Sequence, residues 1–178
     1  RLVAAGQLRL LEKFRHDAVT GFAGAALEIE PWGGEVLYHE DAPPNTGAPP
    51  LRKVERISVL DTPRFEDSPA LMRTLEATGR LKRAVGDTVP IVGVSIAPFS
   101  LPVIQLGFEA YLQLIYERRP LFDRLMAINE EFCVRWSSAQ LAAVRAWSRE
   151  HWHLQSYWYG FAAAQIALYR GDAEGAYL

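Results

Sequence analysis

The spacing of apolar residues along the chain predicts a succession of helices joined by short strands. From Leu2 to Phe14, apolar and charged residues recur as an amphipathic helix requires. A second helix is predicted with Ser68 as its N-cap, Pro69 in its first turn and Gly86 at its end. Residues 118–143 carry another apolar stripe at helical spacing. These three stretches are therefore predicted to form the main helices of the chain.

The central stretch predicts a strand, a loop and a helix in direct succession. Residues from Pro90 to Ile96 are nearly all apolar or small, which favours a strand buried on both faces. After the break at 97–100, apolar residues recur at three and four positions from Val103 to Ile115. Ligand sites of parallel α/β folds lie at the carboxyl ends of strands, so 97–105 is the predicted site wall. Its candidate binding residues are Ala97, Phe99, Ser100 and Gln105. A plain strand end followed by a helix cap would use the same residue types, so that alternative stays open.

Shorter elements fill the rest of the chain. Asp17–Phe22 and Glu35–His39 fit short strands, and the proline-rich 40–50 stretch predicts a loop over one end of the fold. A short exposed helix is predicted over 51–61 and a loop over 62–67. The alternation of helices and strands is typical of an α/β fold with a parallel sheet.

Composition excludes several classes of protein. The chain has 178 residues, 49% apolar and 22% charged, which is typical of a globular domain. Its net charge is -2 and its basic residues are scattered, so we expect no nucleic-acid partner. Cys133 is the single cysteine, which excludes an internal disulfide and predicts a buried, reduced thiol in a cytoplasmic protein. Without an apolar run of roughly 20 residues, we expect no membrane association.

A family resemblance rests on the central stretch. Gly93-Val-Ser-Ile-Ala-Pro-Phe-Ser-Leu, followed by Gln105-Leu-Gly-Phe-Glu-Ala-Tyr-Leu, resembles the "GPFTL…QLxGxExxL" segment of the uroporphyrinogen decarboxylase superfamily. That superfamily includes the decarboxylases of haem synthesis and the methylcobalamin-dependent methyltransferases. Further similar segments lie at 28–36, 43–50 and 81–90, in the family's order, within a span from Leu8 to Ala143.

The resemblance implies a TIM-type barrel. Because a complete barrel usually needs roughly 250 residues, we expect only part of one here. The predicted fold class is thus α/β: a partial TIM-type (β/α) barrel over residues 1–143 and a helical tail over 144–178. The tail is rich in Trp and Tyr and weakly resembles part of a tetratricopeptide repeat.

The resemblance also implies a second part of the site, at Gly24 and Glu28. Decarboxylases of the family have an Asp where this chain has Gly24, and a Tyr where it has Ile104. Glu28 and Glu30, with Trp32-Gly33, instead resemble the "VEAEAFG" segment of the methyltransferase branch. Of these two carboxylates, we expect one to cap backbone or face substrate and the other to be solvated. The resemblance therefore favours a corrinoid-dependent methyltransferase-like protein, incomplete as a catalyst, with a decarboxylase as the alternative.

Zinc and a corrinoid are the cofactors that the family implies, and the sequence assigns neither of them to particular residues of this chain. The family's His-x-Cys and distant Cys zinc ligands would fall beyond the end of the resemblance. The metal-capable runs at 39–41 and 151–153 have spacings that do not favour a shared ion. The expected partner is a small-molecule or corrinoid-protein substrate, and whether the chain is an enzyme stays open. A third hypothesis is a non-catalytic helical module that assembles with a second copy through the aromatic tail.

Overall fold

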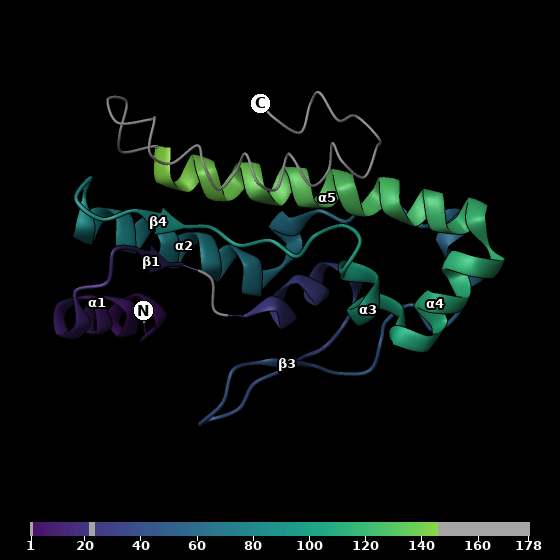
Figure 1. Ribbon diagram of the computed structural model, residues 1–178, viewed down its shortest axis with the longest axis horizontal. Helices are drawn as coiled ribbons and strands as arrows, with labels where there is room; N and C mark the ends of the chain where they lie inside the picture. The colour runs from purple at the N-terminus through teal and green to yellow at the C-terminus, as the bar shows by residue number, and fades with distance from the viewer. Residues whose placement is uncertain (1, 22–23, 146–178) are drawn as a thin grey trace. The chain divides into compact units, whose positions relative to one another are not determined.

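The computed structural model describes residues 2–21 and 24–145 (Figure 1). Predictions for residues 146–178, including the tetratricopeptide-like tail and the histidines at 151 and 153, lie outside this part of the chain. The chain divides into two compact units. Of the described residues, the first unit contains 2–21, 72–94 and 136–145, and the second contains 24–71 and 95–135.

A short parallel sheet and the helices packed on it form the first unit. Strand β1 (Val19–Thr20) pairs in parallel with β4 (Ile91–Val92), with Val19 opposite Ile91. Helix α1 (Leu2–Phe14), most of α2 (Pro69–Val85) and the end of α5 (Arg119–Arg145) complete the unit. Its buried core consists of Ala4, Val19, Leu81, Val85, Ile91 and Val144. The three predicted helices and the parallel pairing are confirmed.

The predicted strand from Pro90 to Ile96 is wrong in its extent, because β4 ends at Val92. Beyond that point the backbone of Val94 pairs with a side chain, not with another strand. The Gln140 Nε2 donates to the Val94 carbonyl at 2.9 Å, and the Val94 N–H donates to Gln140 Oε1 at 3.0 Å. Val94 is also exposed, so the stretch is not buried on both faces as predicted.

Short 3₁₀ helices, a hairpin and three α-helices form the second unit. In chain order, the elements are η1 (Ala25–Trp32), β2 (Val36–Leu37), β3 (Asn45–Thr46), η2 (Val54–Val59), η3 (Phe65–Asp67), α3 (Leu101–Leu106), α4 (Phe108–Glu117) and the first part of α5. Strands β2 and β3 pair antiparallel, so the proline-rich stretch forms one side of a hairpin. The helix predicted from Val103 to Ile115 is interrupted at Gly107, whose φ of +84° only glycine adopts easily.

The core of the second unit joins segments that are far apart in sequence. It consists of Leu51, Ile57, Leu106, Tyr111, Leu114, Phe122, Leu125 and Met126. Ile57 is completely buried, so the predicted exposed helix at 51–61 is exposed on one side only. Arg124 on α5 fixes η2 by donating to the carbonyls of Ile57 and Leu60 at 2.8 and 2.9 Å. Such burial of apolar side chains is the main source of stability for a fold with so few strands.

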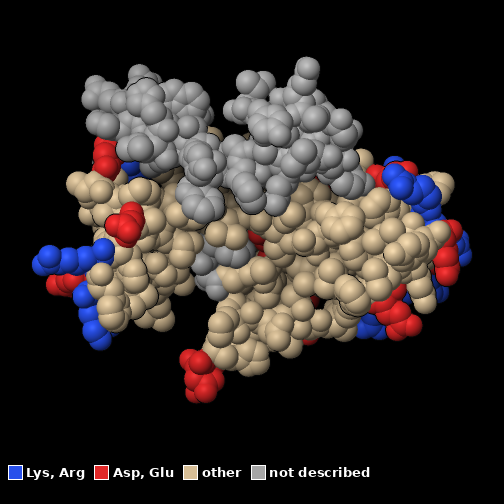
Figure 2. All heavy atoms as spheres, in the orientation of Figure 1, with Lys and Arg blue, Asp and Glu red and all other residues tan. Residues whose placement is uncertain are grey.

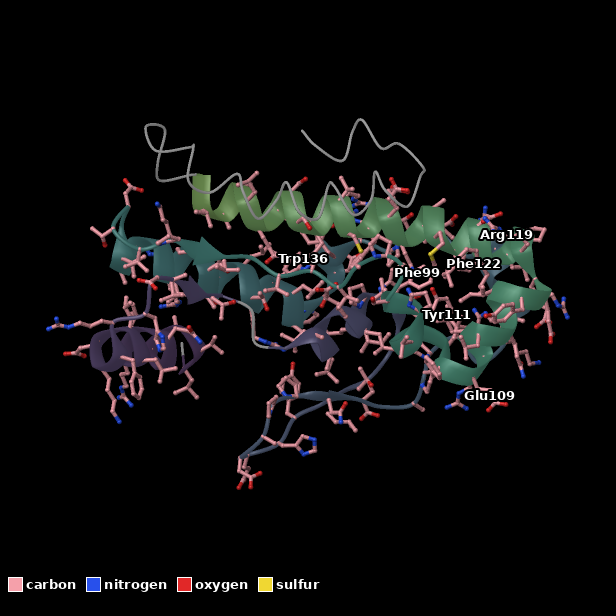
Figure 3. The ribbon with its side chains drawn as sticks, viewed as in Figure 1. Phe99, Glu109, Tyr111, Arg119, Phe122 and Trp136 are labelled. Atoms are coloured by element: carbon pink, nitrogen blue, oxygen red, sulfur yellow. The ribbon has the colours of Figure 1, made fainter. Side chains whose placement is uncertain are left out.

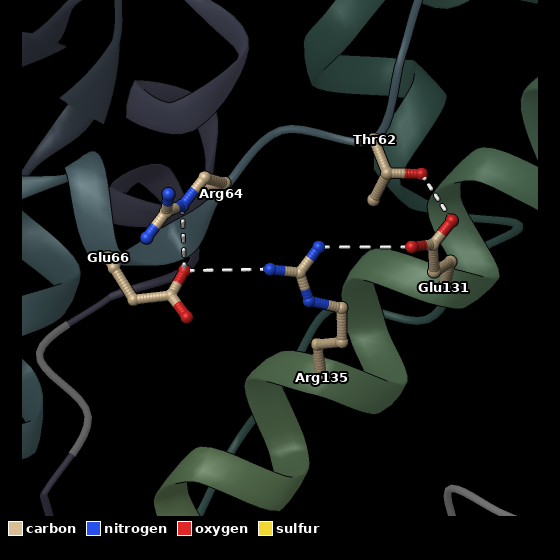
Figure 4. A network of polar contacts seen from close by, with 5 residues as sticks. All are labelled: Thr62, Arg64, Glu66, Glu131 and Arg135. Carbon is tan, nitrogen blue, oxygen red and sulfur yellow. Dashed lines mark hydrogen bonds and ion pairs between the residues drawn. The ribbon is translucent and has the colours of Figure 1, made fainter.

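Charged residues form small networks on the surface of the second unit. In the network of Figure 4, Arg135 lies 3.6 Å from Glu66 and 3.8 Å from Glu131, and Thr62 donates to Glu131 at 2.7 Å. Exposed pairs of this kind each contribute only about 0–1 kcal/mol. Acidic and basic side chains are interspersed on the face shown in Figure 2. No helix within residues 2–21 and 24–145 is long and apolar enough to cross a membrane.

Candidate functional site

Glu28 joins the two parts of the predicted site. Its side chain lies on η1 and is completely buried. The Ile96 N–H donates to both carboxylate oxygens, at 3.0 and 3.1 Å, and the Ser95 hydroxyl donates at 3.4 Å. A buried carboxylate is costly unless it accepts hydrogen bonds, and here backbone and hydroxyl donors just before the predicted site wall supply them. The structure therefore brings the 24–28 segment to the start of the 97–105 segment.

Two side chains of α5 bind the carbonyls of the same stretch. The Cys133 thiol donates to the Ile96 carbonyl at 3.1 Å. One turn earlier on α5, the Asn129 amide donates to the Pro98 carbonyl at 3.2 Å. Residues four apart lie on one face of a helix, which is why these two side chains both reach the stretch from Ile96 to Pro98.

The carbonyls of Ala97 and Phe99, in the same stretch, are also hydrogen-bonded. The Ala97 carbonyl accepts the backbone N–H groups of Ser100 and Leu101, at 2.8 and 3.0 Å, and so starts α3. The Phe99 carbonyl accepts the hydroxyl of Tyr111, on α4, at 2.7 Å. Four consecutive carbonyls, from Ile96 to Phe99, are thus hydrogen-bonded within the second unit.

Gln105 and Asn129 form a reciprocal amide pair, and both are completely buried. Gln105 Nε2 donates to Asn129 Oδ1 at 2.9 Å, and Asn129 Nδ2 donates to Gln105 Oε1 at 3.1 Å. Asn129 lies within the apolar stripe predicted for this helix, and its buried amide is hydrogen-bonded to the Gln105 amide and to the Pro98 carbonyl.

Phe99 and Ser100 are the exposed members of the predicted site. The Phe99 ring is 50% exposed, and it contacts Tyr111 and Phe122 edge-on with ring centroids 5.7 and 6.3 Å apart (Figure 3). Ser100 precedes α3, but its hydroxyl makes no capping hydrogen bond. A half-covered aromatic ring beside a hydroxyl presents an apolar surface and one polar group to solvent.

The environment of Cys133 suppresses its thiolate. The pKa of the Cys133 thiol is raised from its ordinary value of 9.0 to about 12. Burial is the largest cause, the negative charges of Glu28 and Glu130 also raise the pKa, and a hydrogen bond with Ser95 lowers it. The thiol is therefore a neutral hydrogen-bond donor and not a nucleophile.

The second carboxylate of the segment also has a structural role. Glu30 accepts a hydrogen bond from the Ala70 N–H at 2.7 Å and another from the Ser68 hydroxyl. The same hydroxyl accepts the Leu71 N–H at 3.2 Å, which confirms Ser68 as the N-cap of α2. The expectation that one carboxylate would be merely solvated is therefore wrong. Both carboxylates of the segment hold backbone groups.

The predicted site residues fall into two groups. Glu28 and Gln105 are buried and hydrogen-bonded, whereas Phe99 and Ser100 face solvent. Gly24 precedes η1 and its carbonyl accepts the Leu27 N–H. Contact of any of these residues with a ligand stays a prediction.

Sequence reasoning missed the hydrogen bonds made by the side chains of Asn129, Tyr111 and Ser95. The one available signal was an amide side chain within the apolar stripe of 121–136.

The donor set of the described residues does not fit a zinc centre. Within residues 2–21 and 24–145, no three His, Cys, Asp or Glu side chains lie close enough to hold one ion. His39, Glu40 and Asp41 are all exposed around the turn of the hairpin. The thiol of Cys133 is bonded to a carbonyl, and its raised pKa disfavours the thiolate that zinc requires.

Comparison with known proteins decides the family. The sequence model described as Uroporphyrinogen decarboxylase (URO-D) matches residues 1–146. The chain belongs to the uroporphyrinogen decarboxylase family. This confirms the family suggested by the 93–112 segment.

Two curated relatives and one solved structure are each similar to most of this chain. A uroporphyrinogen decarboxylase of Solibacter usitatus is 28% identical over 148 residues, covering 80% of this chain and 42% of the relative. One from Carboxydothermus hydrogenoformans is 31% identical, covering 76% and 40%. A methyltransferase from Methanosarcina mazei superposes with a TM-score of 0.70 at 20% identity, covering 80% of this chain and 42% of that protein. The fold is thus shared with that methyltransferase, and the chain spans about two fifths of the length of the relatives it matches.

Proposed function

We propose that this chain builds one wall of the substrate cavity of a methyltransferase-like member of the family, on part of a TIM-type barrel. In this proposal the substrate is a corrinoid or a corrinoid protein, and the chain alone binds it without completing a reaction. The observation that carries the proposal is the bond between Glu28 and the Ile96 N–H. It joins the segment that resembles the methyltransferase branch to the segment that resembles the family's strand-loop-helix unit.

The backbone at Gly24 favours the methyltransferase-like alternative over decarboxylation. Gly24 has a φ of +155° and a ψ of +144°, a conformation that side-chain-bearing residues avoid. Family decarboxylases have an Asp at the matching position, and an Asp here would be strained. Ile104, in place of a Tyr, removes a second polar group that decarboxylation would be expected to need.

The side chains of the site suggest distinct roles in binding. The exposed Phe99 ring offers a flat apolar surface for the face of a macrocycle, and the Ser100 hydroxyl offers one hydrogen bond to its polar edge. Glu28 and Asn129 bond to backbone and would act through the position of that loop. A zinc-bound thiolate would supply the nucleophile in methyl transfer, and the described residues offer no set of ligands for it.

Methyl transfer from methylcobalamin to a small thiol tests this function. The reaction would be followed by the change in cobalamin absorbance, with and without added zinc. The chain itself and a family-length protein containing it would be compared. We expect the chain to bind methylcobalamin without turnover, and the longer protein to transfer the methyl group. Failure of the longer protein in both conditions would reject the activity.

Decarboxylation of a tetrapyrrole acetate side chain is the second candidate. It is favoured by the names of the curated relatives, which are uroporphyrinogen decarboxylases at 22–31% identity. Release of carbon dioxide from uroporphyrinogen by the longer protein, without any methyl transfer, would favour this reaction. The same assay on a Gly24→Asp variant would show whether the acid alone restores it.

A further inference from the structure

We infer that Ile96–Ser100 is a preformed loop, and that Glu28, Asn129 and Tyr111 are positioning residues that hold it before any ligand binds. The inference rests on the proposed function in one respect, namely that this loop carries the ligand-contacting groups. It goes further by separating the residues that hold the loop from those that contact the ligand.

The first step concerns the backbone of the loop. Residues 96–100 form neither strand nor helix, so no sheet partner satisfies their polar groups, although residues 96–98 are half-buried. Buried N–H and C=O groups must be paired, or each costs free energy comparable to a lost hydrogen bond. The partners of this loop are therefore decisive for its conformation.

Those partners are mainly side chains from three different elements. Glu28 on η1 accepts the Ile96 N–H, Asn129 on α5 donates to Pro98, and Tyr111 on α4 donates to Phe99. A loop fixed at three successive points by separate helices has few alternative conformations that keep every bond. Bonds of this kind make the loop rigid without a strand ladder.

The orientation of the positioning side chains is itself fixed. The amide of Asn129 is oriented by its reciprocal bonds with Gln105, which is buried in turn. The ring of Tyr111 stacks on Phe122 with an interplanar angle of 24° and centroids 6.4 Å apart. Asn129 and Tyr111 thus each have a second contact that leaves the polar atom directed at the loop, as a preorganised site requires.

The loop then presents only a few groups to solvent. Phe99 is half exposed, and the Ser100 hydroxyl makes no capping bond. Rigid presentation of an aromatic ring reduces the entropy that a ligand must remove on binding. Phe99 and Ser100 are therefore assigned to the ligand, and Glu28, Asn129 and Tyr111 to the support of the loop.

Amide hydrogen exchange tests the inference without any ligand. In the wild-type chain, the Ile96 N–H should be protected from exchange. The Glu28→Ala variant removes its acceptor and should raise its exchange rate roughly tenfold or more, because the acceptor is a completely buried carboxylate. The Glu28→Gln variant keeps an acceptor oxygen and should restore most of the protection.

Glu30 supplies a matched control, two residues along the same 3₁₀ helix. Glu30→Ala should speed exchange of the Ala70 N–H, which Glu30 accepts, and leave Ile96 unchanged. A general loss of stability would instead speed both amides in both variants. That outcome, or an unprotected Ile96 N–H in the wild-type chain, would overturn the inference. If Glu28→Ala does not fold, the protection of the Ile96 N–H in the wild-type chain still tests whether the loop is preformed.

Binding of methylcobalamin separates this inference from the proposed function. Phe99→Ala should weaken binding at least several-fold without changing exchange at Ile96. Tyr111→Phe removes only the hydroxyl bonded to the Phe99 carbonyl and should also weaken binding, although Tyr111 does not contact the ligand. If the wild-type chain binds no methylcobalamin but keeps Ile96 protected, the proposed function fails and the preformed loop stands. Unaltered binding by Tyr111→Phe would remove Tyr111 from the positioning residues.

Discussion

Alkylation of Cys133 tests the buried polar cluster most directly. The thiol is the only one in the chain, so a single mass increase with iodoacetamide reports its modification. Its pKa rises from 9.0 to about 12, a difference of three pH units. Well below pH 9 this lowers the thiolate fraction roughly a thousand-fold relative to the unfolded chain, and the thiolate is the reactive form.

The assay compares the rate of modification at pH 8 in buffer and in denaturing urea. We expect the native rate to be lower by at least the thousand-fold that the pKa predicts, since burial also blocks access. The Glu28→Gln variant removes one of the charges that raise the pKa, so its native rate should increase while its rate in urea stays the same. Native and denatured rates within tenfold of each other would refute the burial and the raised pKa together.

Four further predictions concern stability, each measured by urea unfolding. Because the folded pKa of Cys133 is raised, its contribution is complete below pH 9 and is lost as the pH rises from 9 towards 12, by up to about 4 kcal/mol; Cys133→Ala should flatten this dependence. Asn129→Ala leaves the amide of Gln105 and a carbonyl without their partner and should cost roughly 2–4 kcal/mol, whereas the exposed Val134→Ala on the same helix should change stability by under about 0.5 kcal/mol. Gly24→Asp should cost about 1–3 kcal/mol, and an unchanged midpoint would contradict the assigned backbone conformation. Ser68→Ala should cost about 1 kcal/mol through loss of the N-cap, with a smaller effect for Ser68→Gly.

Helices could be predicted well because their signals are local. The bounds of α1 agree with the apolar spacing from Leu2 to Phe14, and α2 begins after its predicted cap and ends before Gly86. The strands could be predicted less well. Strand β4 stops at Val92 because the side chain of Gln140, 46 residues after Val94, binds the backbone groups of Val94, and nothing in the local pattern indicates this.

The candidate site shows the same division. The sequence placed Glu28 and the 97–105 segment in one site, through their resemblance to a family. It did not indicate that Glu28 would bond to Ile96 or that Gln105 would pair with Asn129. Those bonds depend on which side chains the packed helices bring within about 3 Å of each other.

By itself, the sequence determined where the helices lie, which residue caps α2, and the family to which the chain belongs. These properties depend on the order and spacing of neighbouring residues along the chain. Only the tertiary structure decided that both carboxylates of η1 hold backbone groups, that Asn129 is buried, and that four consecutive carbonyls of the loop are bonded. The physical reason is that a buried polar group must find a partner, and the partner is supplied by distant segments that meet only when the chain is packed.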